Sequence, residues 1–247
     1  MAGTQKNFIL RRSTLIQIFA DGSNYNTMLS LYRDRKINGI SGFTTNPSLM
    51  RKDGVVDYLS FAKALLKEIT EVPVSFEVIS DDFDEMERQA KIISALGHNV
   101  YVKIPVVNTK GKSSYDLIKK LSLQDIQLNV TSVFTKEQIL ALADVMCHDI
   151  DHIISIFAGR IADTGRNPKK IVKFAVDTMP RNVFVLWAST REIYNIYQAN
   201  KIGCDIITAT PEIIGKYNSL RGYDLNDYTV DTVKMFYNDA LSARYEL

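Results

Sequence analysis

Short apolar runs alternate along the chain with longer amphipathic stretches. Eight of these runs are rich in Val, Ile, Leu and Phe, which is typical of strands that are buried on both faces. They cover residues 15–21, 38–45, 73–79, 99–105, 126–133, 152–157, 182–188 and 205–209. The pattern therefore predicts eight strands of a parallel sheet, with the intervening stretches as helices.

The amphipathic stretches carry the periodicity of helices that cover a sheet. They span residues 25–35, 56–69, 83–95, 113–121, 136–146, 168–178 and 191–200. Thr135 followed by Gln138 is a capping-box pattern, and Asn167 before Pro168 is a typical helix start. A final helix is predicted over residues 231–243.

Eight strands that alternate with helices indicate a closed (β/α)8 barrel, the TIM-barrel architecture of the α/β class. No GxGxxG or GxxxxGKS/T motif supports an open nucleotide-binding sheet instead. Residues 15–247 are predicted to form one catalytic domain, because no repeat or low-complexity linker divides them. Residues 1–14 are predicted to form an N-terminal arm, and the final helix is expected to pack back on the barrel.

Composition narrows the possible partners. The 30 basic and 28 acidic residues leave a net charge of +2, which gives no reason to expect nucleic acid or a membrane surface. No apolar run reaches the roughly 18 residues of a membrane span. Neither of the two cysteines has metal-ligand spacing, so no metal site is expected. Few cysteines and no signal peptide favour the cytoplasm.

Lys103 stands inside the apolar run of residues 99–105. Lysine is rarely buried without a partner, and desolvation inside a strand would lower the pKa of its amine. A neutral amine attacks carbonyl groups, which is how Schiff-base lysines arise. The alternative is a lysine on an edge strand whose side chain reaches water.

Two acids occupy comparable places in other runs. Asp21 ends the first run and Glu77 lies inside the third. Imine chemistry needs several proton transfers, so acids near Lys103 favour the catalytic hypothesis. Asp21 can instead be the N-cap of the following helix. Glu77 can be an ion-pair partner of Lys103, which is compatible with a role in catalysis.

Other polar residues also fall at the carboxyl ends of the runs, where a barrel places its active site. Asn129 and Thr131 are two apart and therefore on one face of their strand, although they can simply cap the strand end. Further polar candidates are Thr44, Asn46 and Ser155, and the aromatic Phe157 follows at the end of the sixth run.

The late runs are followed by cationic and hydroxyl side chains. Arg160, Ser189 and Arg191 suit an anion such as phosphate, which barrels commonly hold in the loops after their late strands. Taken singly, each arginine can equally form a surface salt bridge.

Five motifs resemble the strand motifs of transaldolases and occur in the order found in that family. They are TTNPSL at 44–49, VKIP at 102–105, NVT at 129–131, FAGR at 157–160 and ASTR at 188–191. The resemblance runs from about residue 18 to the C-terminal helix. Each motif is weak by itself, but five in order at barrel spacing are specific.

The resemblance implies roles for the catalytic candidates. Lys103 matches the lysine that forms an imine with C2 of a ketose. Asp21 matches the aspartate that takes the proton of the C4 hydroxyl. Glu77 and Thr131 match the pair that holds a catalytic water.

The remaining matched positions are implied to bind the substrate. Asn46 and Asn129 match side chains that bind substrate hydroxyls and the enamine. The others match the substrate pocket and the phosphate contacts, and they are Thr44, Ser155, Phe157, Arg160, Ser189 and Arg191.

Two positions subdivide the family. Related fructose-6-phosphate aldolases tend to have Gln in place of Glu77 and Tyr in place of Phe157, so this chain looks like a transaldolase in the narrow sense. The chain departs from the family in the sequence FADGSN at 19–24 and in a longer segment at 108–113. These departures put the identity of the substrate in doubt more than the type of reaction.

The resemblance implies transfer of dihydroxyacetone from fructose 6-phosphate or sedoheptulose 7-phosphate to an aldose phosphate. The protonated imine is the electron sink, so no metal or organic cofactor is expected. Three alternatives stay open: a specialised transaldolase for an unusual or sulfonated sugar, an aldolase that releases free dihydroxyacetone, and a pseudoenzyme that only binds sugar phosphates. Small family members form rings through their C-terminal helix, so a homo-oligomer is expected.

Overall fold

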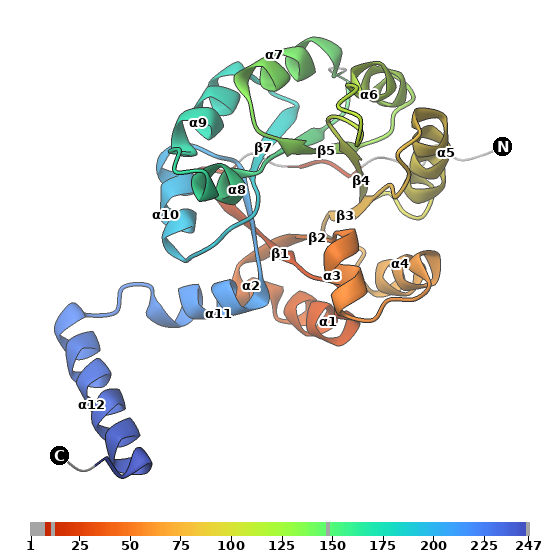
Figure 1. The fold of residues 1–247 in the computed structure, drawn as a ribbon. Coiled ribbons are helices and arrows are strands. Elements are labelled where there is room, and N and C mark those ends of the chain that lie inside the picture. Colours follow the sequence, from red (N-terminus) through yellow and green to blue (C-terminus); the bar gives the residue numbers. More distant parts are fainter. Residues whose placement is uncertain (1–7, 11–12, 147–148, 246–247) are drawn as a thin grey trace.

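Eight parallel strands close into a barrel in the order β1 to β8 (Figure 1). The computed structural model describes residues 8–10, 13–146 and 149–245. The strands are β1 Gln17–Asp21, β2 Ile40–Thr44, β3 Val74–Glu77, β4 Val100–Pro105, β5 Leu128–Val133, β6 His152–Ile156, β7 Val183–Trp187 and β8 Ile206–Ala209. Each lies inside a predicted run, so the predicted (β/α)8 barrel is confirmed.

Helices surround the barrel (Figure 1). They are α1 Tyr25–Arg33, α2 Arg35–Asn38, α3 Pro47–Lys52, α4 Tyr58–Glu68, α5 Phe83–Ser94, α6 Tyr115–Ser122, α7 Lys136–Val145, α8 Ala158–Asp163, α9 Lys169–Thr178, α10 Tyr194–Lys201, α11 Pro211–Leu220 and α12 Leu225–Ala243. The predicted capping box of α7 is present at Thr135 and Gln138. In the described part of the chain, no helix combines the length and apolarity needed to cross a bilayer.

The sequence analysis did not predict four helices, namely α2, α3, α8 and α11. Helix α2 has four residues, and α3 and α8 have six each, too few to show a clear helical period. The start of α3 is nevertheless encoded, because Asn46 accepts a hydrogen bond from the backbone of Leu49 and Pro47 occupies the first helical position.

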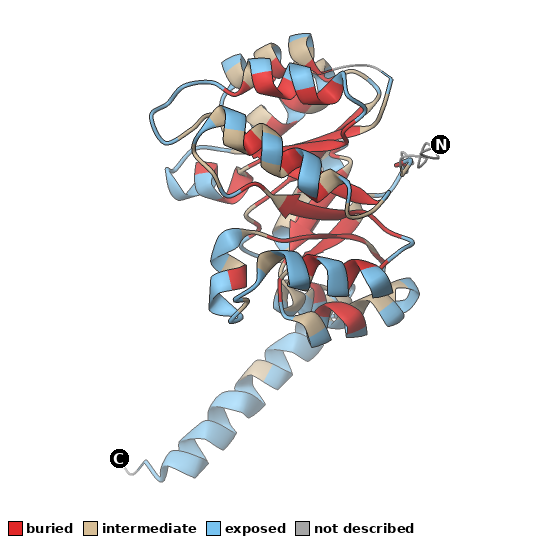
Figure 2. Cartoon of the chain, turned by 90° about the vertical axis from the view of Figure 1, so that its right-hand side faces the viewer, coloured by how far each residue is buried: buried red, intermediate tan, exposed pale blue. Residues whose placement is uncertain are grey.

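The strands are largely buried (Figure 2) and separate two apolar clusters, one between the sheet and the helices and one inside the barrel. Alternation along β7 shows the division. Val183 and Val185 face the helices, whereas Phe184 and Leu186 fill the interior. The barrel interior is packed tightly around Phe19, since a Cβ added to Gly42 would lie 2.6 Å from the Phe19 ring. This packing leaves no space for a ligand beside Phe19.

The N-terminal end of the barrel is covered by residues 8–10. The Phe8 amide donates to Gln127 Oε1 at 3.1 Å, and the Leu10 amide donates to Asp151 Oδ2 at 2.8 Å. The side chain of Leu10 is buried against the interior layer. Residues 1–7 and 11–12 of the predicted arm lie outside the described residues.

The C-terminal helix corrects one expectation. Helix α12 begins at Leu225, earlier than predicted, and projects away from the barrel instead of packing on it (Figures 1 and 2). Every residue of α12 except Thr232 is exposed, including Leu225 at 78% and Phe236 at 63%. Its apolar residues are spread around the helix, and the sequence alone does not say which surface they cover.

Candidate functional site

A cavity of about 390 Å³ opens at the carboxyl ends of the strands. It gathers side chains from all eight strands or the loops that follow them. The predicted site residues that line it are Asp21, Thr44, Asn46, Glu77, Lys103, Thr131, Ser155, Phe157, Arg160, Ser189 and Arg191. Residues far apart in the sequence thus meet at one place, as the barrel prediction required.

Lys103 lines this cavity and is 7% exposed. Its Nζ donates to the carbonyl oxygen of Thr45 at 2.7 Å and lies 3.1 Å from Glu77 Oε2. The pairing of β3 with β4 places Glu77 directly beside Lys103. Because the sheet is closed, Lys103 is not on an edge strand, and a proton that leaves its amine has a carboxylate next to it.

Asp21 enters the cavity from the end of β1. Its Oδ1 accepts a hydrogen bond from Thr44 Oγ1 at 2.8 Å. Desolvation raises the pKa of Asp21, the positive charge of Lys103 and the Thr44 bond oppose this, and the charge of Glu77 raises it further. The side chain that caps α1 is Asn24, so the capping role considered for Asp21 is not what the structure shows.

Thr44 belongs to a chain of hydroxyls that leads to Asp21. Its Oγ1 lies 2.5 Å from Thr208 Oγ1. Thr44 has one hydroxyl hydrogen, and it is donated to Asp21, so Thr208 is the donor in the second bond. Thr208 is a cavity residue that sequence reasoning missed, although its polar side chain near the end of the last apolar run was a usable signal.

Asn129 lies below the cavity, not on its wall. Its Nδ2 donates to Ser75 Oγ at 3.0 Å, and its Oδ1 accepts from Ser155 Oγ at 2.7 Å. The register places Asn129 beside Lys103. The side chain therefore belongs to a buried network under the amine, and Ser75 is a second participant that the sequence analysis overlooked.

Thr131 presents a different case. Its Oγ1 is buried, lines the cavity and has no hydrogen-bond partner among the described residues. A buried hydroxyl left unpaired is costly, which favours a water molecule or a substrate group as its partner. Simple capping of the strand end does not account for this hydroxyl.

The cationic side of the cavity is formed by Arg160 and Arg191. Arg191 Nη2 lies 2.6 Å from Asp163 Oδ2, and both side chains are about half exposed. Such a surface pair contributes little stability and leaves the guanidinium able to bind an anion. Arg160 lies over the ring of Phe157, with 5.8 Å between its Cζ and the ring centroid.

The loop after β7 approaches α8 very closely. Ser189 has a left-handed backbone with φ of 62°. A Cβ on Gly159 would lie only 1.6 Å from the carbonyl oxygen of Ser189. Glycine at position 159 therefore lets Ser189 and its neighbours reach the cavity wall.

The helix-capping bond of Asn46 limits what its side chain can do. Its Oδ1 accepts from the Leu49 amide at 2.9 Å, so its amide nitrogen is the group that remains for a substrate. Further lining residues that the sequence analysis did not select are Ser132, Thr190 and Thr210.

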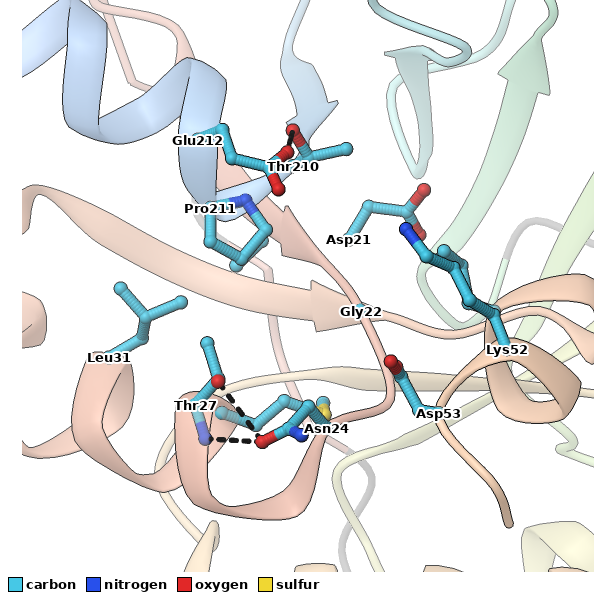
Figure 3. Close-up of a pocket in the computed structure, with 13 residues that line it drawn as sticks. Asp21, Gly22, Asn24, Thr27, Leu31, Lys52, Asp53, Thr210, Pro211 and Glu212 are labelled. Carbon is cyan, nitrogen blue, oxygen red and sulfur yellow. Dashed lines mark hydrogen bonds between the residues drawn. The ribbon is translucent and has the colours of Figure 1, made fainter.

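A second cavity of about 280 Å³ adjoins the first and shares Asp21 and Thr210 with it (Figure 3). Its other walls come from α1, α3 and α11, and its lysine is the exposed Lys52. Of these two cavities, as the described residues define them, the first alone is lined by a buried lysine paired with a carboxylate. Across the described residues, no three His, Cys, Asp or Glu side chains are grouped as metal ligands.

Comparisons with known proteins agree with the geometry. A family model described as transaldolase/fructose-6-phosphate aldolase matches residues 18–243. A "probable transaldolase" of Bdellovibrio bacteriovorus is 35% identical over 203 residues, which cover 81% of this chain and 87% of the relative. One from Nitrosopumilus maritimus is 31% identical over 208 residues, which cover 81% and 86%.

Solved structures support the fold alone, because their sequences are distant. A dihydrodipicolinate synthase of Rhodopseudomonas palustris aligns with a TM-score of 0.56 at 13% identity, covering 96% of this chain and 83% of its own. The YdjI aldolase of Escherichia coli K12 aligns with a TM-score of 0.55 at 11% identity, covering 81% and 76%.

Proposed function

Because the chain belongs to the transaldolase/fructose-6-phosphate aldolase family, we propose that it transfers a dihydroxyacetone unit from a ketose phosphate to an aldose phosphate through a Schiff base at Lys103. The observation that carries this proposal is the buried amine of Lys103, 3.1 Å from Glu77 Oε2 in a cavity that also contains Asp21. Fructose 6-phosphate and sedoheptulose 7-phosphate are the proposed donors.

Imine formation is the first stage. The neutral amine of Lys103 adds to C2 of the ketose, and the resulting carbinolamine loses water to give a protonated imine. Glu77 is placed to accept and return the protons of these steps. The hydroxyl of Thr131, which has no partner in the described part of the chain, is available to hold the water molecule that carries these protons.

Cleavage is the second stage. Asp21 removes the proton of the C4 hydroxyl, the C3–C4 bond breaks, and its electron pair passes to the imine to form an enamine. The aldose phosphate leaves with a new carbonyl group at the former C4. The enamine then adds to a second aldehyde, whose oxygen takes the proton from Asp21, and hydrolysis frees Lys103.

Phe157 favours transfer over release of free dihydroxyacetone. Its ring packs against Phe134 with centroids 5.7 Å apart, and no tyrosine is among the described residues that line the cavity. A phenol in the pocket could protonate the enamine and so lead to free dihydroxyacetone. Without a phenol, the enamine persists until an aldehyde acceptor binds. Free dihydroxyacetone produced at the same rate with and without an acceptor would contradict transfer.

Arg191→Ala should weaken binding of phosphorylated sugars. Loss of a charge-assisted hydrogen bond is expected to raise their KM by about tenfold, with little change for unphosphorylated dihydroxyacetone. Steady-state kinetics with both substrates measures this difference. Arg166→Ala is the matched control, since Arg166 is exposed and does not line the cavity. An equal loss for both substrates would argue against phosphate binding by Arg191.

Glu77→Gln should slow the formation and hydrolysis of the imine. The amide keeps the size of the side chain but cannot accept the proton, so we expect a decrease of about 10²-fold. Single-turnover trapping of the donor with borohydride gives the rate. An unchanged rate would remove Glu77 from the proton relay.

We also propose that α12 packs against a second copy of the chain to form a homo-oligomer. Helix α12 exposes Val233, Phe236 and Leu241, and burying such side chains is favourable. Phe236→Asp with Leu241→Asp should lower the sedimentation coefficient, whereas Asn238→Asp should not. A wild-type chain that sediments as a monomer would contradict this assembly.

A further inference from the structure

Strand β5 has an irregular backbone where it reaches the cavity mouth. Ser132 has φ of 61°, in the left-handed region that favours glycine. The pairing of β5 with β6 shifts register between Val130 and Val133, on either side of this residue. Strained backbone of this kind persists only where the surroundings enforce it, and it clusters at functional sites.

This irregularity changes which side chains face the cavity. In a regular strand consecutive side chains point to opposite faces, so a residue next to Thr131 would face the helices. Instead, Thr131 and Ser132 both line the cavity. A bulge that redirects a side chain toward an active site has this effect.

Both hydroxyls are available to a ligand. Thr131 Oγ1 is buried and unpaired among the described residues. Ser132 is half-buried, and its hydroxyl makes no hydrogen bond within the described part of the chain. Two adjacent hydroxyl groups on one wall suit a polyhydroxylated chain better than an apolar one.

The level of Ser132 along the barrel indicates which part of the sugar it meets. Lys103 pairs with Asn129, and Ser132 follows three residues later, nearer the carboxyl end of β5 and the mouth of the barrel. In the proposed mechanism the three-carbon unit is attached to the buried amine of Lys103, so the rest of the sugar extends from it toward the mouth. We infer that Ser132 is a substrate-binding residue whose hydroxyl bonds a hydroxyl of the aldose portion, beyond C3 of the ketose. This inference rests on the proposed function and deepens it.

Ser132→Ala tests the inference by removing the hydroxyl alone. One neutral hydrogen bond corresponds to an increase in KM of about two- to tenfold, expected for both the ketose phosphate and the aldose phosphate. The kcat should stay within about twofold, since a bond made equally in ground and transition states affects KM. Borohydride trapping of dihydroxyacetone at Lys103 should be unchanged, because this substrate lacks the aldose portion.

Ser132→Gly distinguishes the loss of substrate binding from the relief of backbone strain at this residue. It removes the hydroxyl and also relieves the left-handed backbone, so KM should rise as for Ser132→Ala while the thermal midpoint increases. Arg244→Gly is the matched control, since Arg244 is exposed, has φ of 53° and does not line the cavity. It should raise the thermal midpoint without changing KM.

Two results would overturn the inference while leaving the proposed function intact. One is an active enzyme in which both Ser132 variants keep the wild-type KM, which would make Ser132 a strained structural residue only. The other is an equally large decrease in the trapping of dihydroxyacetone, which would place the effect of the substitution at Lys103. A wild-type chain that never traps donor would instead refute the proposed function, and this inference with it.

Discussion

Lys103→Met should abolish covalent trapping of the donor. Wild-type protein treated with donor and borohydride is expected to gain a stable three-carbon adduct at Lys103, detected by mass spectrometry of the peptide. Methionine has a similar length and no amine, so transfer should decrease by about 10⁴-fold or more. The effect is large because every later step passes through the imine.

Lys52→Met is the matched control for this variant. Lys52 lies on the wall of the adjacent cavity that also contains Asp21, and its side chain is exposed (Figure 3). It should trap donor and transfer dihydroxyacetone at the wild-type rate. Trapping that survives in Lys103→Met, or is lost in Lys52→Met, would show that the nucleophile has been assigned to the wrong cavity.

Asp21→Asn should block carbon–carbon cleavage but not imine formation. The amide cannot accept the C4 proton, so we expect turnover of ketose phosphates to decrease by about 10²- to 10⁴-fold. Trapping of dihydroxyacetone should persist, because it needs Lys103 and Glu77 but no C4 hydroxyl. Comparing the two assays tests the assignment. A variant that loses both equally would make Asp21 a residue that positions the lysine.

The raised pKa of Asp21 also predicts pH dependence. Cleavage needs the ionised carboxylate, so kcat/KM should fall as pH drops through a pKa higher than that of an ordinary aspartate. The charge of Glu77 raises this pKa, and Glu77→Gln should therefore move the acid limb of the profile to lower pH. A limb that stays in place would show that Asp21 does not control it.

The same raised pKa makes Asp21 unfavourable for stability at neutral pH. The folded protein holds the proton of Asp21 more tightly than the unfolded chain does. Stability from this group is therefore complete below the unfolded pKa and is lost as pH rises through the folded pKa. Asp21→Asn should raise the thermal midpoint at pH 7, and this gain should shrink in acid. A destabilised variant would contradict the desolvation of Asp21.

The sequence by itself determined the barrel and the main chemical groups of the site. Eight runs of buried-strand composition, separated by helical periods, leave few architectures, because each hydrophobic face must be covered. Side chains alternate between the two faces of a strand, so a lysine in the middle of one run points either into the barrel or toward the helices. The cavity at the mouth of the barrel showed that Lys103 points inward, and the pairing of β3 with β4 put Glu77 beside it.

Only the tertiary structure decided features that depend on contacts between distant segments. Asn129 had the right residue type and strand position, yet neighbouring strands hold it under the amine through Ser75 and Ser155. Ser132 reaches the cavity because the backbone of β5 departs from regular alternation, which a strand pattern cannot reveal. Helix α12 was predictable as a helix but not as a projecting one, because its apolar side chains indicate that they are to be covered but not which surface covers them.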